Sequence, residues 1–349
     1  MPLLATRSWK ERDSGAPGAA GSEGRSPGSS GSRPPGSSGT EDPGTQPPGS
    51  SGTEDRGIRS PGSPGAEEPR ARLPGPPIRE GSPTGLEGGG AVHSPLAAPP
   101  LAVLVHGVTS SSRTWWRVGP ALAERGYRVL AVDLRGHGAS PRTEAGLSVA
   151  DLADDVADTV EATSRSPGTV AGAPVDLLVG HSLGALVALE LVGRRPGFAR
   201  RLVVEDPPGS ASVDWPAVAV GIEADTQRAV TDPDALRRDL EAANPAWPPG
   251  EAERRVADLA DCDGRAIADA VRPGVPFDLP GLLAAAPLPV LLLLAEEALG
   301  SSLLLGLDRK AAVEALPDGT TRVLPAGHSV HREALDAWLA ALDAWLAGS

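Results

Sequence analysis

Cysteine, methionine and most aromatic residues are scarce in this chain of 349 residues, which has one Cys, one Met, one Tyr and two Phe. The single cysteine, Cys262, excludes an intramolecular disulfide framework. It is neutral about the redox compartment of the protein. A lone cysteine in a segment of helical pattern is most often a packing residue, and we assign it no chemical role.

Long apolar runs are also missing. The longest, Pro289 to Ala295 with its flanks, is far shorter than the about 20 residues that cross a bilayer. The first residues lack the apolar core and the small-residue cleavage site of a secretory signal. We therefore predict a soluble, cytoplasmic protein with no membrane partner.

Basic residues are outnumbered, and the formal net charge is -13. Acids and bases nearly cancel before residue 95, so the negative charge falls on the rest of the chain. An acidic domain without a basic stripe argues against nucleic acid as a partner. A small-molecule substrate is the partner that we expect.

Gly, Pro and Ser dominate residues 1–95, where a nine-residue block at 34–42 recurs at 47–55. Such a segment cannot bury enough apolar surface to offset the entropy of ordering it. The prediction is a disordered tail over residues 1–95 and one folded domain over residues 96–349.

Short apolar runs alternate with helical patterns after residue 100, which is typical of β-α-β units. This rhythm predicts an α/β fold, with a mostly parallel sheet and helices on both faces. Strands are expected at residues 101–105, 127–132, 175–179, 202–204, 289–294 and 321–324, and the main helices at 115–125, 148–164, 183–194 and 308–316. A final helix closes the chain.

Residues 207–287 interrupt this rhythm with short helical patterns broken by Pro and Gly. The segment is interpreted as a helical cap inserted between two strands. Its Trp215, Trp247 and Phe277 could line a pocket, although packing within the cap is the simpler interpretation.

The sharpest motif is Gly180-His181-Ser182-Leu183-Gly184, a match to GxSxG placed between a predicted strand and a predicted helix. A turn this tight strains the nucleophile's backbone and requires flanking residues without a Cβ. The motif predicts a serine nucleophile, Ser182. An aspartate at this position would have indicated a dehalogenase or an epoxide hydrolase.

Four motifs in order make the chain from about Leu101 onward similar to the α/β-hydrolase fold family. They are His106-Gly107-Val108, the loop from Asp133 to Ser140, the GxSxG turn, and Ala326-Gly327-His328 after the last strand. The resemblance implies an oxyanion hole made by the backbone N–H groups of Val108 and Leu183. It also implies a structural role for His106, a loop-organising role for Asp133 and Arg135, and His328 as the general base.

The carboxylate that orients His328 departs from the family's commonest pattern, because the expected Asp position is taken by Ala298. An acid can instead follow the strand at 202–204, and Glu205 matches the position used by relatives with this displaced acid. Glu205 is the preferred candidate, and Asp206, Glu296 and Glu297 remain alternatives. Geometry decides among them, since a triad is defined by contacts and not by chain order.

These features predict a serine hydrolase that cleaves an ester, a lactone or a related acyl bond without a metal or an organic cofactor. C–C bond hydrolases, thioesterases and perhydrolases share the same machinery, and a non-catalytic binding protein could retain the fold. The sequence offers no strand before residue 101 beyond a short stretch near 91–93. The strand at 127–132 is therefore expected at the sheet edge, open to dimerisation.

Overall fold

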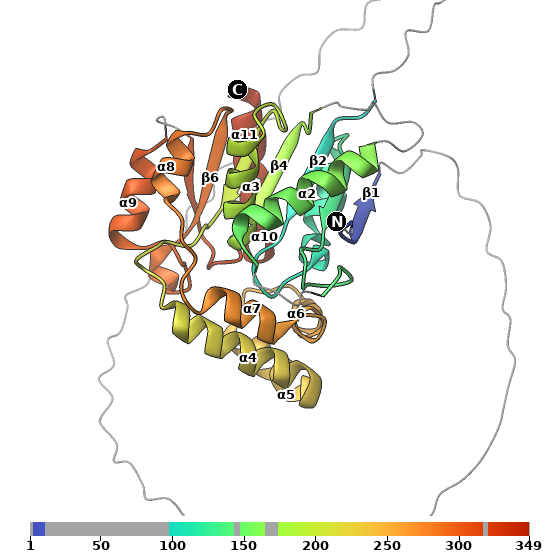
Figure 1. Cartoon of the computed structure of the whole chain (residues 1–349), viewed down its shortest axis with the longest axis vertical. Helices are drawn as coiled ribbons and strands as arrows, with labels where there is room; N and C mark the ends of the chain where they lie inside the picture. Colours follow the sequence, from blue (N-terminus) through green and yellow to red (C-terminus); the bar gives the residue numbers. More distant parts are fainter. Residues whose placement is uncertain (1–2, 11–97, 143–146, 165–173, 317–319, 349) are drawn as a thin grey trace, which may run out of the picture. The chain divides into compact units, whose positions relative to one another are not determined.

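A central sheet organises the chain (Figure 1). The computed structural model describes residues 3–10, 98–142, 147–164, 174–316 and 320–348. Within them the strand order is β1-β3-β2-β4-β5-β6-β7. All neighbours pair in parallel except β1, which runs antiparallel to β3. The strands are β1 (Thr6–Trp9), β2 (Leu101–Val105), β3 (Arg128–Val132), β4 (Leu177–His181), β5 (Leu202–Glu205), β6 (Val290–Ala295) and β7 (Thr321–Leu324). The predicted α/β fold with a mostly parallel sheet is confirmed.

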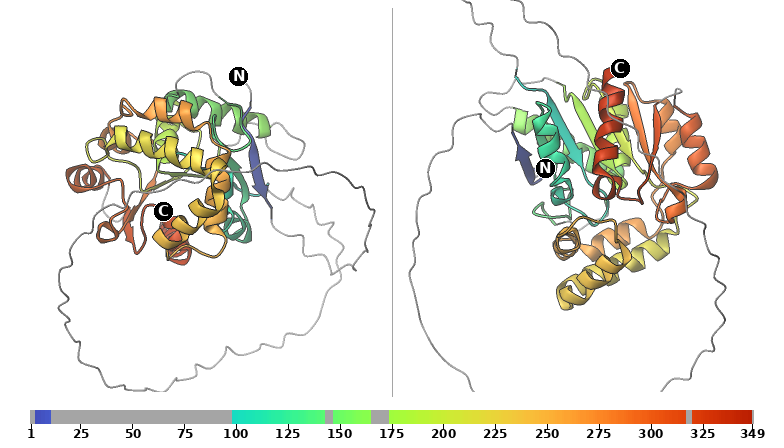
Figure 2. Two further views of the ribbon diagram at one scale, coloured as in Figure 1. Left: turned by 90° about the horizontal axis from the view of Figure 1, so that it is seen from below. Right: turned by 180° about the vertical axis from the view of Figure 1, so that it is seen from behind.

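Alternate strand residues face two separate cores, as the period of two in a strand requires. In β2, Val103 and Val105 join the core on one face of the sheet, while Ala102 and Leu104 join the core on the other. The first core is covered by α2 (Val149–Ser164), α3 (Leu183–Arg194), α8 (Leu279–Ala284) and α9 (Gly306–Glu314). The second is covered by α1 (Val118–Glu124), α10 (Val330–Glu333) and α11 (Leu335–Gly348), and the views from opposite sides show the two layers (Figures 1 and 2).

The expectation that β3 lies at the sheet edge is wrong. Strand β1 pairs with it from Thr6 opposite Val132 to Trp9 opposite Val129. An antiparallel edge strand needs hydrogen bonds on one side only and few buried side chains. Here Leu4, 6 % exposed, and half-buried Trp9 are the apolar anchors, too few to form a strand pattern in the sequence.

Residues 3–10 therefore belong to the folded domain and not to the predicted tail. Residues 11–97 lie outside the described residues, so the predicted disorder of the tail, its repeat and the stretch near 91–93 stay predictions.

Four cap helices lie beyond the carboxyl ends of the parallel strands (Figure 1). They are α4 (Trp215–Thr231), α5 (Pro233–Ala243), α6 (Glu251–Ala260) and α7 (Gly264–Val271), and they interrupt the chain between β5 and β6. The predicted insertion at 207–287 thus holds a cap, but its last part does not belong to it. Helix α8 packs on the sheet through Leu279 and Leu283.

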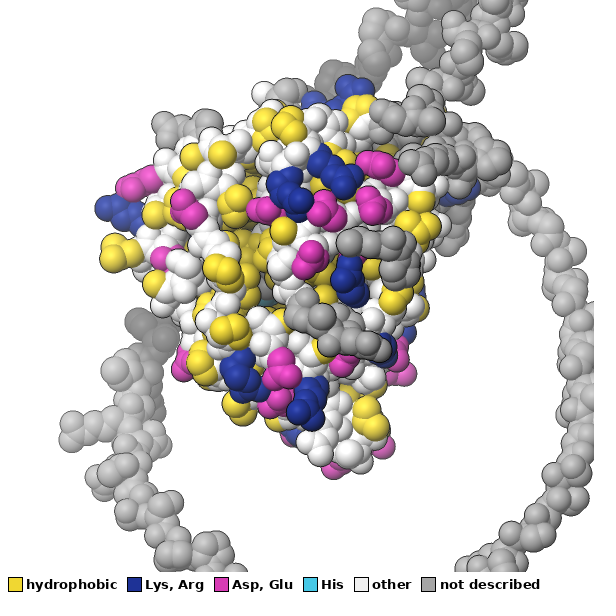
Figure 3. Space-filling view, viewed as in Figure 1, with side chains coloured by type: hydrophobic (Ala, Val, Ile, Leu, Met, Phe, Trp, Pro, Cys, Tyr) yellow, Lys and Arg dark blue, Asp and Glu magenta, His cyan; other side chains and the backbone are white. Residues whose placement is uncertain are grey.

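Charged side chains of both signs are interspersed on the face shown in Figure 3. On α2 and α3 they form ion pairs, with Arg194 and Arg195 both contacting Asp154. Exposed pairs of this kind contribute little stability individually. No helix in the described part of the chain is long and apolar enough to cross a membrane.

The first testable prediction concerns the β1 anchor. The Trp9 ring lies so close to Gly119 of α1 that a Cβ on this glycine would sit 2.6 Å from it. Because Trp9 is only half buried, Trp9→Ala should lower the free energy of unfolding by about 2 kcal/mol, less than for a fully buried tryptophan. Urea denaturation measures this loss. Leu3→Ala, at a side chain 54 % exposed, is the matched control, and equal losses in the two variants would contradict the role of β1.

Candidate active site

Ser182 occupies a strained turn between β4 and α3. Its backbone has φ 53° and ψ -119°, a region that residues with a Cβ rarely adopt. The two glycines of the motif are required by contact. A Cβ on Gly180 would lie 2.3 Å from the Gly184 carbonyl oxygen, and one on Gly184 would lie 2.3 Å from the Val105 carbonyl oxygen. The turn has the geometry of a nucleophile elbow.

His328 contacts Asp206, and not the Glu205 that the sequence favoured. Its Nδ1 lies 2.7 Å from Asp206 Oδ2. Asp206 is fully buried, and its Oδ1 accepts hydrogen bonds from Ala295 N at 3.1 Å and Ser302 Oγ at 2.9 Å. These donors fix the carboxylate, so it can hold one tautomer of the His328 ring.

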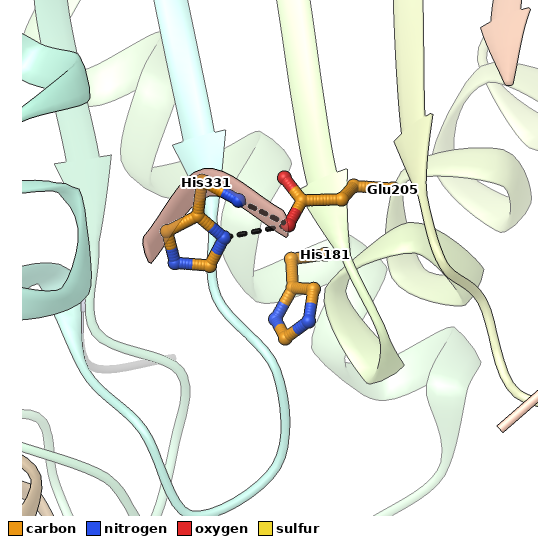
Figure 4. Close-up of side chains that lie close together, drawn as sticks. All are labelled: His181, Glu205 and His331. Carbon is orange, nitrogen blue, oxygen red and sulfur yellow. Dashed lines mark hydrogen bonds and ion pairs between the residues drawn. The ribbon is translucent and has the colours of Figure 1, made fainter. Parts of the chain in front are cut away.

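Glu205 pairs instead with His331, the histidine three residues further along (Figure 4). Glu205 Oε1 lies 2.6 Å from His331 Nδ1 and accepts from the His331 backbone N–H at 3.0 Å. Its Oε2 accepts from Trp338 Nε1 at 2.9 Å. Burial raises the pKa of Glu205 and lowers the pKa of His331 well below its usual value. Both shifts favour a neutral pair beneath the site.

Strand alternation explains why these adjacent carboxyl groups diverge. Glu205 is the last residue of β5 and shares a sheet face with Val203, which belongs to the α11 side of the core. Asp206 follows the strand with φ 35°, and this turn directs its side chain toward β6 and the His328 loop.

The other two candidate acids lie away from His328. Glu296 and Glu297 are exposed, and Glu297 forms an ion pair with Arg309 Nε at 2.9 Å. Neither makes a hydrogen bond to His328 within the described residues.

His328 lies beside the elbow. The ring of His181, which precedes Ser182, has its centroid 4.7 Å from the His328 ring, and His181 Nε2 lies 3.0 Å from the His328 carbonyl oxygen. The Ser182 N–H donates to the Glu205 carbonyl, one residue before Asp206, at 2.9 Å. In the described chain no hydrogen bond joins the Ser182 hydroxyl to His328. Such bonds are often long before substrate binds.

Two backbone N–H groups have no acceptor among the described residues, those of Val108 and Leu183, and both residues line one cavity with Ser182. A planar peptide group fixes its N–H when its carbonyl is held. The Gly107 carbonyl is bound by His106 Nδ1 at 2.8 Å and by Ser110 N at 3.2 Å. The Ser182 carbonyl accepts from Ala185 N at 2.9 Å. Both free N–H groups are therefore oriented before any ligand arrives.

His106 and His137 both hydrogen-bond to residues 107–111, the candidate oxyanion loop. His106 Nε2 accepts from Leu134 N at 2.9 Å, which leaves Nδ1 as the donor to Gly107. Burial lowers the pKa of His106, consistent with this neutral form. A histidine in the turn after Arg135 could have lain at the surface, but His137 is fully buried, and its Nε2 accepts from Thr109 N at 3.1 Å.

The loop that contains Asp133 and Arg135 is held by its own side chains, as the resemblance implied. Asp133 Oδ1 accepts from Ser112 N at 2.6 Å, and Arg135 binds Asp155 through Nε at 2.8 Å and Nη2 at 2.5 Å.

Side chains of cap helix α6 bind the same oxyanion loop. The sequence did not predict these contacts. Arg255 donates to the carbonyl and the hydroxyl of Thr109, a residue with φ 56°. Buried Asp258 accepts from Ser111 Oγ at 2.5 Å, and Arg332, next to His331, forms an ion pair with Glu251 at 3.1 Å. The cap and the oxyanion loop are thus one polar network.

His181, Glu205 and His331 have ligand-type atoms within 4.8 Å of one another, the spacing of a metal site (Figure 4). Among the ligand-type atoms of these residues, His181 Nε2, Glu205 Oε1 and His331 Nδ1 already form hydrogen bonds within the protein. Besides the bonds given above, His331 Nε2 lies 2.6 Å from Thr114 Oγ1. A metal ion would have to displace this network, so the donor set fits a structural hydrogen-bond cluster better.

The buried histidines generate a prediction for acid stability. Burial lowers the pKa of His137 from the ordinary 6.5 to about 3. Between pH 6.5 and pH 3 the unfolded chain binds a proton at His137 that the folded protein does not. The contribution of His137 to the free energy of unfolding therefore falls as the pH drops from 6.5 toward 3. Denaturation between pH 7 and 5 should therefore give a shallower pH slope for His137→Gln, by up to about 1.4 kcal/mol per pH unit. Identical slopes for the variant and the parent would contradict a neutral, buried His137.

Curated proteins resemble the chain over part of their length. A segment of 107 residues is 35 % identical to 2-(acetamidomethylene)succinate hydrolase of Mesorhizobium japonicum and covers 31 % of this chain and 35 % of that protein. Another of 91 residues is 38 % identical to epoxide hydrolase B of Mycobacterium tuberculosis and covers 26 % of this chain and 23 % of that protein. The matches span about a third or less of these relatives.

Solved structures match over more of the fold. A hydrolase from Pseudomonas aeruginosa superposes with a TM-score of 0.56 at 22 % sequence identity, covering 72 % of this chain and 91 % of that one. Identity at this level supports the fold alone. Residues 102–342 match the sequence profile of the alpha/beta hydrolase family. This span runs from β2 into α11 and includes the elbow, the cap and the His328 loop. The chain therefore belongs to the alpha/beta hydrolase family.

Proposed function

We propose that this chain hydrolyses a carboxylic ester, a lactone or a related acyl bond of a small molecule through an acyl-enzyme. Ser182 is the nucleophile, His328 the general base and Asp206 the carboxylate that orients it. The observation that carries the proposal is the 2.7 Å contact between His328 Nδ1 and a fully buried Asp206. It leaves His328 Nε2 free to take the Ser182 proton.

The reaction proceeds in two acyl transfers. Ser182 Oγ attacks the carbonyl carbon while its proton moves to His328 Nε2, and Asp206 stabilises the resulting imidazolium. The oxyanion accepts hydrogen bonds from Val108 N–H and Leu183 N–H. His328 then protonates the leaving group. A water molecule, deprotonated by His328, then attacks the acyl carbon. The bond to Ser182 Oγ breaks, and His328 returns the proton to this oxygen as the acid leaves. No step uses a metal or an organic cofactor.

The relatives support hydrolysis without fixing the bond. The Mesorhizobium relative is named for a succinate substrate and the Mycobacterium relative for epoxides. A serine at the elbow favours acyl transfer over epoxide opening for this chain. Thioester and C–C bond hydrolysis use the same groups.

A fluorophosphonate probe tests the nucleophile directly. Labelling should fall on the peptide that contains Ser182 and disappear in both Ser182→Ala and His328→Ala, with the modified peptide identified by mass spectrometry. Folded protein that takes no label would overturn the proposal and favour a binding protein that retains the fold.

The choice of acid has its own prediction. Asp206→Asn should lower kcat by about 10⁴-fold, because an amide holds the wrong His328 tautomer. Glu205→Gln should leave kcat within about tenfold and act mainly on stability, since Glu205 contacts His331 and Trp338 but not His328. Steady-state kinetics on one ester, with urea denaturation of both variants, separates the two roles. A collapse of kcat in Glu205→Gln with Asp206→Asn unaffected would reverse the assignment.

A further inference from the structure

An apolar cavity opens directly on Ser182. Its volume is about 30 Å³, small beside the roughly 300 Å³ or more of pockets for drug-sized ligands. The walls come from both oxyanion-hole residues, the loop after β5, α4, the end of α7 and the segment before α9. The lining residues are Val108, Ser182, Leu183, Pro208, Val213, Trp215, Val218, Val271, Val275 and Leu303.

No lining residue carries a charge. The polar side-chain groups of the wall are the Ser182 hydroxyl and the Trp215 indole N–H. The two arginines nearest the oxyanion loop already have partners outside the cavity wall. Arg255 binds Thr109, and Arg332 binds Glu251 and Ser110. A carboxylate entering this cavity would lose water without gaining a cationic partner, which is strongly unfavourable.

The cavity lies on the acyl side of the reaction. His328 must reach the leaving group to protonate it, so the leaving group lies beside His328. The cavity is lined by the nucleophile and both oxyanion donors but not by His328. The group that occupies it therefore remains attached to the carbonyl carbon.

We infer that the acyl group of the substrate is short, apolar and uncharged. This inference rests on the proposed function and sets the chain apart from a relative named for a dicarboxylate. Trp215 limits the length of the acyl chain, because it is the largest side chain of the wall and its ring packs at 88° to the Phe277 ring, with the two centroids 6.5 Å apart. Of the aromatic residues considered from the sequence, Trp215 lines the cavity, whereas Trp247 and Phe277 are not among the lining residues.

Three methyl esters test the inference with the full-length protein, with acid release followed by pH-stat titration. Methyl butyrate should have a kcat/KM at least about 100-fold above that of monomethyl succinate, whose carboxylate would be unpaired. The kcat/KM of methyl butyrate should also exceed that of methyl octanoate by about tenfold, because an acyl chain that a pocket cannot accommodate lowers kcat/KM by about this factor.

Two variants move the specificity in opposite directions. Trp215→Ala should raise the octanoate-to-butyrate ratio about tenfold by enlarging the cavity. Val213→Arg, at a half-buried wall position, should raise the succinate-to-butyrate ratio by at least about tenfold by supplying a cation. Val220→Ala and Val220→Arg, on the same helix as Trp215 but 58 % exposed and outside the wall, are the matched controls and should change neither ratio.

The outcomes separate the two proposals. Loss of fluorophosphonate labelling in folded protein overturns the proposed function and the inference together. Labelled protein that hydrolyses monomethyl succinate or methyl octanoate as well as methyl butyrate overturns the inference alone. Labelled protein that does not turn over methyl butyrate also overturns it.

Discussion

Two consecutive carboxyl groups at the end of β5 hold the site together, and the backbone turn between them is the constraint on which the rest depends. Glu205 points to the α11 face and binds His331 and Trp338, while Asp206 turns through a positive φ to reach His328. One strand end therefore fixes His328, in the loop after β7, and His331, in α10. The Glu205 contact anchors α10 to the core, and the Asp206 contact orients the His328 ring.

The oxyanion loop is likewise held by more than one side chain. His106 binds the Gly107 carbonyl, and Arg255 of the cap binds the Thr109 carbonyl. The first contact fixes the peptide group that contains the Val108 N–H, so this N–H is oriented although it has no acceptor among the described residues. The arrangement couples the cap to the chemistry, since α6 carries residues that bind the loop.

Much of the fold could be predicted because it rests on local pattern. Continuous apolar runs indicate strands buried on both faces, and the GxSxG turn could be placed because tight turns need glycine at fixed positions. Strand β1 could not be found, because Leu4 and Trp9 carry its burial and its partner, β3, is more than a hundred residues away. Its stability comes from pairing with an existing edge, which no local pattern encodes.

By itself the sequence determined the parallel strands from β2 onward with the helices between them, the turn at Ser182, the loop after β2 and the loop that carries His328. These depend on residues near one another in the chain and on the few conformations that glycine-rich turns allow. Only the tertiary structure shows that His328 contacts Asp206 and not Glu205. A difference of one residue at a strand end reverses the direction of the side chain, and the φ of the following residue sets its reach. The tertiary structure also decided the apolar character of the cavity at Ser182, whose walls come from separate segments that only the packed cap brings together.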